Sequence, residues 1–264
     1  MELNGRHVVI TGGSQGIGEA LAGEFAAAGA RVLVVARSAD RLEVIARRIG
    51  GSFIAADLGD AGTVDTLFER CVEELGHVDV WVNNAGLETS DAFVDVTPDQ
   101  LRAVARLNFE APLVLTRAAV DHMLERGSGH VVQMSSVAGA IPFPGLAAYA
   151  GTKAGLTNFT ETLRLELKGT DVGLTVVAPG PVDTEMWDRL ETDDGYARPA
   201  LRRFALLQFL PKLDTSAIAE ATVRAVERSK AHVRMPARFG MYHVLNNAPR
   251  RLVQGALVGV TLHR

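Results

Sequence analysis

The stretch Val8-Val9-Ile10-Thr11-Gly12-Gly13-Ser14-Gln15-Gly16-Ile17-Gly18 decides the fold of this 264-residue chain. It begins with β-branched residues typical of a buried strand. Glycines at 12, 16 and 18 follow, and apolar residues then recur at helical spacing from Ile17 to Ala28. A strand, a glycine turn and a helix in this order predict a dinucleotide-binding unit, whose backbone N–H groups and helix N-terminus hold a pyrophosphate. A turn that only joins strand to helix is the alternative.

The rest of the chain continues the alternation of strands and helices. Further buried strands are expected at residues 31–36, 52–56, 78–82, 130–134, 173–178 and 231–235. The sequence shows no internal repeat and no linker-like stretch. We therefore predict a single doubly wound Rossmann domain over residues 1–264, with a parallel sheet and helices on both faces.

Composition excludes several classes of protein. The formal net charge of −4 argues against nucleic acid as a general partner. Cys71 is the only cysteine and follows a helical pattern, so we expect it in the core. The seven histidines show no ligand spacing, and no metal site is expected. The early first strand and the absence of a run of roughly 20 apolar residues predict a cytoplasmic protein.

Tyr149 and Lys153 form a pair suited to proton transfer. They stand four residues apart in a helical pattern and therefore share a helix face. A nearby ammonium favours the phenolate, so we expect Lys153 to lower the pKa of Tyr149 from its usual value of roughly 10. Ser136 lies at the end of the strand predicted at 130–134 and could hold a substrate oxygen.

These residues resemble the short-chain dehydrogenase/reductase family, from about residue 5 to about residue 234. The landmarks follow that family's order: the glycine turn, Asp57, Asn83-Asn84-Ala85-Gly86, Asn108, Ser136, Tyr149-x-x-x-Lys153 and Pro179-Gly180. The resemblance implies an enzyme that transfers a hydride between NAD(P) and a carbonyl or secondary alcohol. It also implies a homo-dimer or homo-tetramer.

The resemblance assigns the catalytic residues. Tyr149 would be the general acid or base, and Lys153 would lower its pKa and bind the nicotinamide ribose. Ser136, rather than Ser135, would hold the substrate oxygen. Asn108 would support a water relay to the lysine.

The resemblance also implies a set of cofactor contacts at the ends of the strands. They are Gly12, Ser14, Gln15, Gly16, Ile17, Gly18, Arg37, Ser38, Asp57, Leu58, Asn84, Ala85, Gly86, Tyr149, Lys153, Pro179, Gly180, Val182 and Thr184.

The end of the second strand bears on the choice of cofactor. NAD sites usually carry an acid at this point, whereas an arginine suits the 2′-phosphate of NADP. Ala36, Arg37 and Ser38 include no acid, which favours NADP over NAD. A surface charge paired with Asp40 is the alternative role of Arg37.

Two segments bear on the substrate. The loop at residues 137–146 and the predicted lid at about 185–213 are both rich in apolar residues. If they cover the active site, the substrate is a lipophilic ketone or alcohol. They could instead pack the domain or a subunit interface.

The C-terminal tail, at about residues 236–264, is basic and apolar. Residues 228–264 hold seven Lys or Arg and no Asp or Glu. The tail could lie on an anionic membrane surface, contact an acidic partner, or fold over the substrate cleft.

More than one function fits these patterns. NADPH-dependent reduction of a lipophilic ketone is the main prediction. Reduction of a 3-oxoacyl thioester and NAD-linked oxidation of an alcohol stay open. A non-catalytic nucleotide-sensing protein is the alternative of another class, and it is disfavoured because the tyrosine and the lysine are both present.

Overall fold

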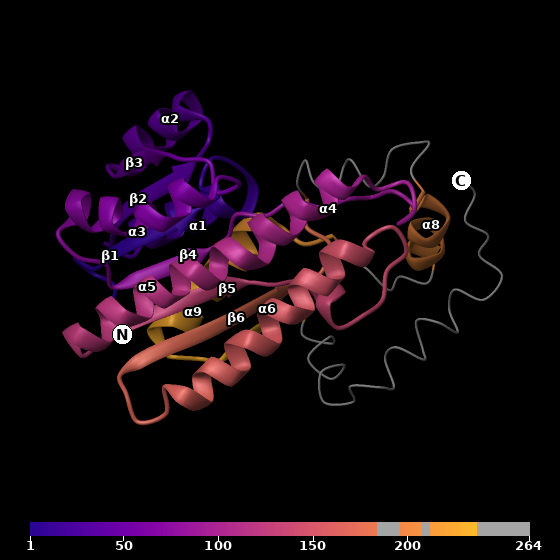
Figure 1. The fold of residues 1–264 in the computed structure, drawn as a ribbon. Helices are drawn as coiled ribbons and strands as arrows, with labels where there is room; N and C mark the ends of the chain where they lie inside the picture. The colour runs from indigo at the N-terminus through magenta and orange to yellow at the C-terminus, as the bar shows by residue number, and fades with distance from the viewer. Residues whose placement is uncertain (184–195, 207–211, 237–264) are drawn as a thin grey trace.

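The computed structural model describes residues 1–183, 196–206 and 212–236 (Figure 1). Within these ranges, seven strands form one parallel sheet in the order β3-β2-β1-β4-β5-β6-β7. They are β1 (His7–Thr11), β2 (Arg31–Ala36), β3 (Ser52–Ala55), β4 (Val80–Asn83), β5 (Gly129–Met134), β6 (Val172–Pro179) and β7 (His232–Met235). The doubly wound α/β fold is confirmed.

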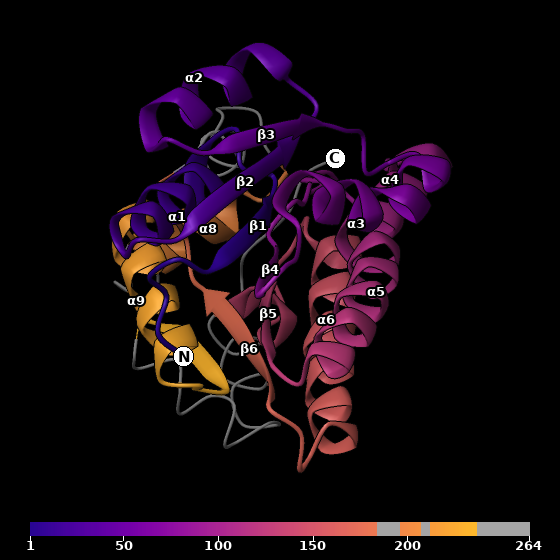
Figure 2. The ribbon, with the colours of Figure 1, turned by 90° about the vertical axis from the view of Figure 1, so that its left-hand side faces the viewer.

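Helices cover both faces of the sheet (Figure 2). One face carries α1 (Gly16–Ala27), α2 (Ala39–Ile49) and α9 (Thr215–Glu227). The other face carries α3 (Ala61–Leu75), α5 (Ala111–Arg126) and α6 (Ala147–Glu166). Shorter helical segments are α4 (Pro98–Ala105), the π-helical turn η1 (Arg106–Glu110), the 3₁₀ turn η2 (Val137–Gly139) and α8 (Arg198–Leu206).

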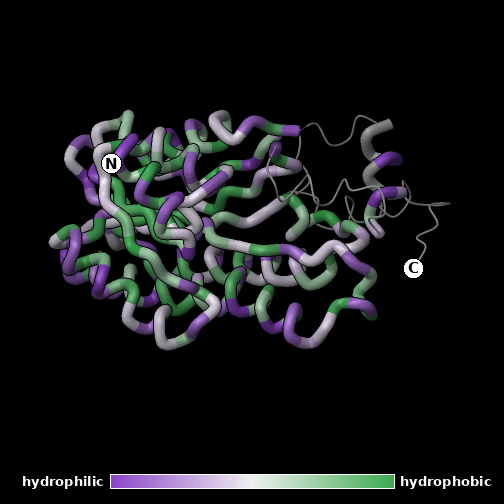
Figure 3. Tube along the Cα trace, turned by 90° about the horizontal axis from the view of Figure 1, so that it is seen from above, coloured by the Kyte–Doolittle hydropathy of each residue, from purple (hydrophilic) through white to green (hydrophobic). Residues whose placement is uncertain are grey.

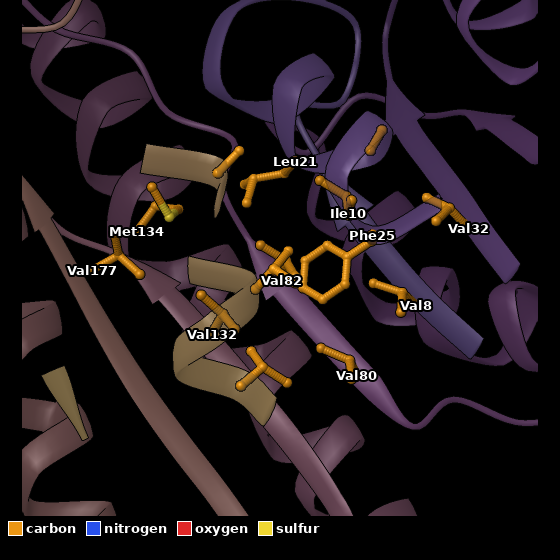
Figure 4. Close-up of a cluster of buried hydrophobic side chains, with 14 of the residues drawn as sticks. Val8, Ile10, Leu21, Phe25, Val32, Val80, Val82, Val132, Met134 and Val177 are labelled. Carbon is orange, nitrogen blue, oxygen red and sulfur yellow. The ribbon is translucent and has the colours of Figure 1, made fainter. Parts of the chain in front are cut away.

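The strands build a core on each side of the sheet because successive side chains point to opposite faces. Val8 and Ile10 of β1 pack with Leu21 and Phe25 of α1 on one side (Figure 4). Val9, between them, belongs to the core on the other side. Figure 3 shows the hydrophobic residues gathered toward the inside of the described chain. Full burial of one such side chain contributes about 1.5–3 kcal/mol.

The order of the strands creates a crevice at the carboxyl edge of the sheet. The chain leaves β1 toward β2 and β3, and then returns to place β4 on the other side of β1. The loops after β1 and β4 therefore diverge, which is where open α/β sheets bind their ligands. This edge carries the predicted glycine turn and the Asn84-Ala85-Gly86 motif.

Some predictions concern residues that the structure does not describe. Thr184 lies outside the described residues, as do most of the predicted lid and nearly all of the predicted tail. The described part of the lid comprises residues 196–206, which include α8, and residues 212–213. None of the described helices has both the length and the apolar character needed to cross a membrane.

Candidate active site

The glycine turn packs directly against the segment that follows β4. A Cβ on Gly12 would lie 2.8 Å from the Cα of Ala85, and a Cβ on Gly18 would lie 2.1 Å from the carbonyl oxygen of Gly12. Gly12 and Gly16 also have positive φ values of 67° and 57°. Glycine is therefore required here by both contact and conformation.

Hydrogen bonds fix the floor of the crevice. The Asn84 side chain donates to the carbonyl oxygens of Thr11 and Gly12, at 2.9 and 3.2 Å. The Thr11 hydroxyl donates to the carbonyl of Val82 and accepts from the backbone N–H groups of Asn84 and Ala85. These bonds tie the ends of β1 and β4 together, so the first turn of α1 keeps its N–H groups at the crevice.

The predicted cofactor residues that the structure describes line one cleft of about 2150 Å³. Ligand pockets typically measure about 300–1,000 Å³, so this cleft has room for a dinucleotide and a second molecule. The site residues that line it are Gly12, Ser14, Gln15, Gly16, Ile17, Gly18, Arg37, Ser38, Asp57, Leu58, Asn84, Ala85, Gly86, Ser136, Tyr149, Lys153, Pro179, Gly180 and Val182.

The end of β2 gives one part of this cleft a positive charge. Arg37 and Ser38 line it at the start of α2, and so does Arg41 one turn further on. Arg41 Nη1 donates to the side-chain oxygen of Gln15 at 2.6 Å, which connects α2 to the glycine turn. Arg41 was missed by the sequence reasoning, which placed the cofactor contacts of this segment only at Arg37 and Ser38. Guanidinium groups are suited to binding phosphate.

The structure brings together the three residues predicted to handle the proton. Ser136 follows β5 and caps η2, where its hydroxyl accepts a hydrogen bond from the N–H of Ala138 at 3.1 Å. Tyr149 and Lys153 lie one turn apart in α6, and the Lys153 Nζ lies 5.6 Å from the centroid of the Tyr149 ring. Lys153 Nζ also donates to the carbonyl of Met134 at 2.7 Å.

Asn108 holds the loop after β4 from behind the cleft. It is fully buried in the π-helical turn η1, a type of turn often found at functional sites. Its side chain accepts from the N–H of Leu87 at 2.9 Å and donates to the carbonyl of Leu87 at 2.8 Å. It also donates to the hydroxyl of Thr152 at 3.3 Å. Asn108 therefore links the loop to α6, one residue before Lys153.

Burial dominates the protonation of the tyrosine and the lysine. Burial raises the pKa of Tyr149 to about 12, and a hydrogen bond with Ser136 offsets part of that rise. Burial lowers the pKa of Lys153 to about 8. The sequence led us to expect a lowered tyrosine pKa. In this structure desolvation of the phenolate is the largest cause, and the Lys153 nitrogen is bonded to the carbonyl of Met134.

Apolar residues line the cleft beside Tyr149. Phe143, Leu146 and Ala197 pack together with Tyr149 in one small cluster. Gly145 has a φ of 83°, and a Cβ on it would lie 3.1 Å from the carbonyl oxygen of Ser90. The loop at 137–146 therefore contacts the loop after β4. From that second loop Leu87 and Glu88 also line the cleft, and the sequence reasoning missed both.

A group of titratable residues lies at the start of β1, where the sequence showed no ligand spacing. Potential ligand atoms of His7, His77 and Asp79 lie within 4.8 Å of one another. Arg6 pairs with the same carboxylate at 3.1 Å, and Arg31 lies 3.5 Å from the His7 ring. Because guanidinium groups surround it, we interpret this group as a charge network that joins β1 to the residues before β4.

The chain matches known proteins over most of its length. The model of the family described as short chain dehydrogenase matches residues 6–195. "Dehydrogenase/reductase SDR family member 7B" of Bos taurus is 36% identical in an alignment of 199 positions, which covers 71% of this chain and 61% of that protein. The chain thus spans about three-fifths of that relative.

Two further relatives match more completely. "11-beta-hydroxysteroid dehydrogenase-like 2" of Arabidopsis thaliana is 30% identical in an alignment of 258 positions, which covers 95% of this chain and 80% of that protein. A short chain dehydrogenase from Burkholderia cenocepacia J2315, solved in complex with NADP, has a TM-score of 0.78 and 28% identity. The match covers 89% of this chain and 97% of that one.

Proposed function

Because the chain belongs to the short-chain dehydrogenase family, we propose that it is an oxidoreductase that transfers a hydride between a nicotinamide dinucleotide and a carbonyl or secondary alcohol. The observation that carries the proposal is the cleft itself. It joins the glycine turn and Asn84 to Ser136, Tyr149 and Lys153. The bound cofactor supplies or accepts the hydride, and the protein supplies position and a proton.

Each residue near Tyr149 has a distinct part in the proposed reaction. The Tyr149 hydroxyl donates a proton to the carbonyl oxygen during reduction. The Ser136 hydroxyl holds that oxygen and stabilises the charge that develops on it. Lys153 places a positive charge beside the phenol and can bind a ribose hydroxyl. Asn108 is a positioning residue, since it holds the backbone of Leu87 and the hydroxyl of Thr152.

NADP is the cofactor that we propose, in preference to NAD. Arg37 and Arg41 line the cleft at the end of β2, where no carboxylate follows the strand until Asp40. Two guanidinium groups near the start of α2 suit a 2′-phosphate. The similar short chain dehydrogenase from Burkholderia cenocepacia was solved in complex with NADP, which supports this choice.

The proposed substrate is a lipophilic ketone or the corresponding secondary alcohol. Support comes from the apolar lining residues Val137, Ile141, Phe143 and Leu146. The Arabidopsis thaliana relative is named after a hydroxysteroid dehydrogenase, which is consistent with a bulky apolar ring. A 3-oxoacyl thioester is an alternative substrate that the same walls would accept.

We also propose that the chain forms a homo-dimer or homo-tetramer. Val114 and Leu124 of α5 and Leu165 of α6 are large hydrophobic side chains exposed on the described monomer. Light scattering on the purified protein would give the oligomeric state directly. Lipid vesicles added to the same sample would test whether the tail at about residues 236–264 contacts a membrane, one of the three alternatives for it.

A panel of cyclic ketones, 3-oxoacyl thioesters and alcohols, assayed by nicotinamide absorbance with NADPH and NADH, tests the proposed reaction. We expect reduction of ketones with NADPH. Tyr149→Phe should keep cofactor affinity within about twofold and lose at least about 100-fold in kcat, because it removes only the proton donor. Turnover near the wild-type rate in Tyr149→Phe would show that the assigned role of the tyrosine is wrong.

A further inference from the structure

Glu88 lines the same cleft as Ser136, Tyr149 and Lys153, the residues proposed to act in the proton transfer. It stands two positions after Gly86. A Cβ on Gly86 would lie 3.2 Å from Asn108 Oδ1 and 3.5 Å from Lys153 Nζ. The negative charge of Glu88 is also near enough to the Tyr149 hydroxyl to raise the pKa of that phenol. Glu88 is therefore close to the place where a reacting oxygen would be held.

The backbone around Glu88 is fixed by the fold. Both polar groups of the Leu87 backbone are bonded to the buried side chain of Asn108. Thr89, on the other side, is buried. The next residue, Ser90, lies against Gly145 of the loop that precedes Tyr149. A residue held at both neighbours keeps a defined position in the cleft, which a recognition group requires.

The surroundings of Glu88 allow its charge to discriminate between ligands. The same cleft is also lined by the apolar side chains of Val137, Ile141 and Phe143. Electrostatic interactions are stronger in such surroundings than in water. A carboxylate has two acceptor oxygens with about four lone-pair sites, so it can accept hydrogen bonds from a ligand as well as from protein groups. It attracts donors and cations and repels anions.

We propose that Glu88 is a substrate-recognition residue, which accepts a hydrogen bond from a hydroxyl or ammonium group that the substrate carries near its reacting carbonyl. This inference rests on the proposed carbonyl reduction and makes its substrate class narrower. The substrate is an apolar carbonyl compound with a second, hydrogen-donating group, and it is not an anion.

Four cyclohexanones that differ only at C4 provide the test. They carry a methyl group, a hydroxyl group, an ammonium group or a carboxylate. The measurement is kcat/KM of the wild-type enzyme with NADPH for each ketone. We expect the hydroxyl and ammonium compounds to exceed the methyl compound by about tenfold or more, as a hydrogen bond to a charged group implies. The carboxylate should be the poorest substrate.

Two substitutions separate hydrogen bonding from charge. Glu88→Ala should bring the hydroxyl, ammonium and methyl compounds to within about twofold of one another and admit the carboxylate. Glu88→Gln keeps one acceptor oxygen, so it should keep part of the preference for hydroxyl and lose the preference for ammonium. Asp91→Asn is the matched control, because it removes one exposed acid three residues away, outside the cleft lining, and should keep all the wild-type ratios.

The results distinguish this inference from the proposed function. If the wild type reduces the methyl compound and Tyr149→Phe does not, the proposed reaction is supported, independently of the results for the Glu88 variants. Equal ratios in the wild type and Glu88→Ala, or a wild-type preference for the carboxylate, would overturn the role of Glu88. If the enzyme reduces none of the four, the proposed reaction fails for this class. Calorimetric binding of the same ketones to the NADP⁺ complex then decides the role of Glu88, and equal affinities in both proteins would reject it.

Discussion

Burial sets the protonation of Tyr149 and Lys153, the two residues on which the proposed chemistry depends. With its pKa raised to about 12, the phenol keeps its proton throughout the physiological range. A neutral phenol is the form that can donate a proton to a developing alkoxide, which supports reduction as the proposed direction. The ammonium of Lys153 loses its proton nearer to neutral pH than a free lysine does, because burial lowers its pKa to about 8.

The lowered pKa of Lys153 predicts a basic limb in the pH profile. The charged ammonium predominates below about pH 8 and is lost above it. If the charge assists the reaction, kcat/KM for ketone reduction should be level below that pH and then fall by up to about tenfold per pH unit. Lys153→Arg keeps a cation at all these values, since guanidinium loses its proton only above about pH 12.

Initial rates between about pH 6 and pH 10 would measure this effect. We expect the wild-type profile to bend near pH 8 and the profile of Lys153→Arg to stay level, whatever its absolute rate. The shape of the curve is informative because a purely structural substitution would lower all points together. A wild-type profile without a bend would contradict the assigned role of Lys153.

The first turn of α1 depends on close contact rather than on flexibility. Gly18 lies inside α1, yet its Cα approaches the carbonyl of Gly12 so closely that a Cβ would lie 2.1 Å from that oxygen. Gly23 lies in the same helix, and a Cβ there would meet no atom within 4 Å. Both glycines therefore lie in α1, but only Gly18 is in close contact with another part of the backbone.

Alanine at these two positions should have opposite effects. Gly18→Ala must displace backbone at the floor of the cleft, so we expect a loss of about 1–3 kcal/mol in the free energy of unfolding and at least about tenfold weaker cofactor binding. Gly23→Ala should raise stability by about 0.5–1 kcal/mol, because alanine favours helix. Urea unfolding and NADPH fluorescence titration would measure both. Similar stability losses in the two variants would contradict this account.

The sequence predicted elements whose pattern is local. The strands at 31–36 and 130–134 are short buried runs, and the glycine turn lies between a strand and a helix, so each could be recognised from adjacent residues. The π-helical turn around Asn108 gave no such signal, since its periodicity continues that of the helices on either side. Glu88 looked like a loop residue because only the fold brings it near Tyr149.

At the scale of the whole molecule, the sequence predicted the layers but not the pairs of distant residues that meet. Alternating strands and helices indicate a parallel sheet covered on both faces. The contact between His7 and Asp79, or between Asn108 and Leu87, depends on the strand order and on the loop paths. The lowered pKa of Lys153 also depends on burial, which the adjacent residues in the sequence do not reveal.

The cleft extends along the carboxyl edge of the sheet and is lined by residues from both sides of the switch point between β1 and β4. Arg37 follows β2 on one side of the switch point, and Lys153 comes from α6 on the other. A ligand that contacts both halves stabilises the folded state by mass action, by about 2.7 kcal/mol at 100 times its dissociation constant. For a chain of this size, that gain corresponds to a rise in Tm of roughly 5–10 °C.

This linkage gives a test of the proposed cofactor that does not require a substrate. Thermal unfolding with NADPH and with NADH at equal concentration should show the larger rise with NADPH. Arg37→Ala should lose most of the rise with NADPH and keep the rise with NADH, because it removes a cation suited to the 2′-phosphate. Arg47→Ala is the matched control: it removes an exposed arginine of α2, the helix that follows Arg37, and this arginine pairs with Glu43. If Arg37→Ala loses the same part of the rise in Tm with both cofactors, Arg37 does not bind the 2′-phosphate.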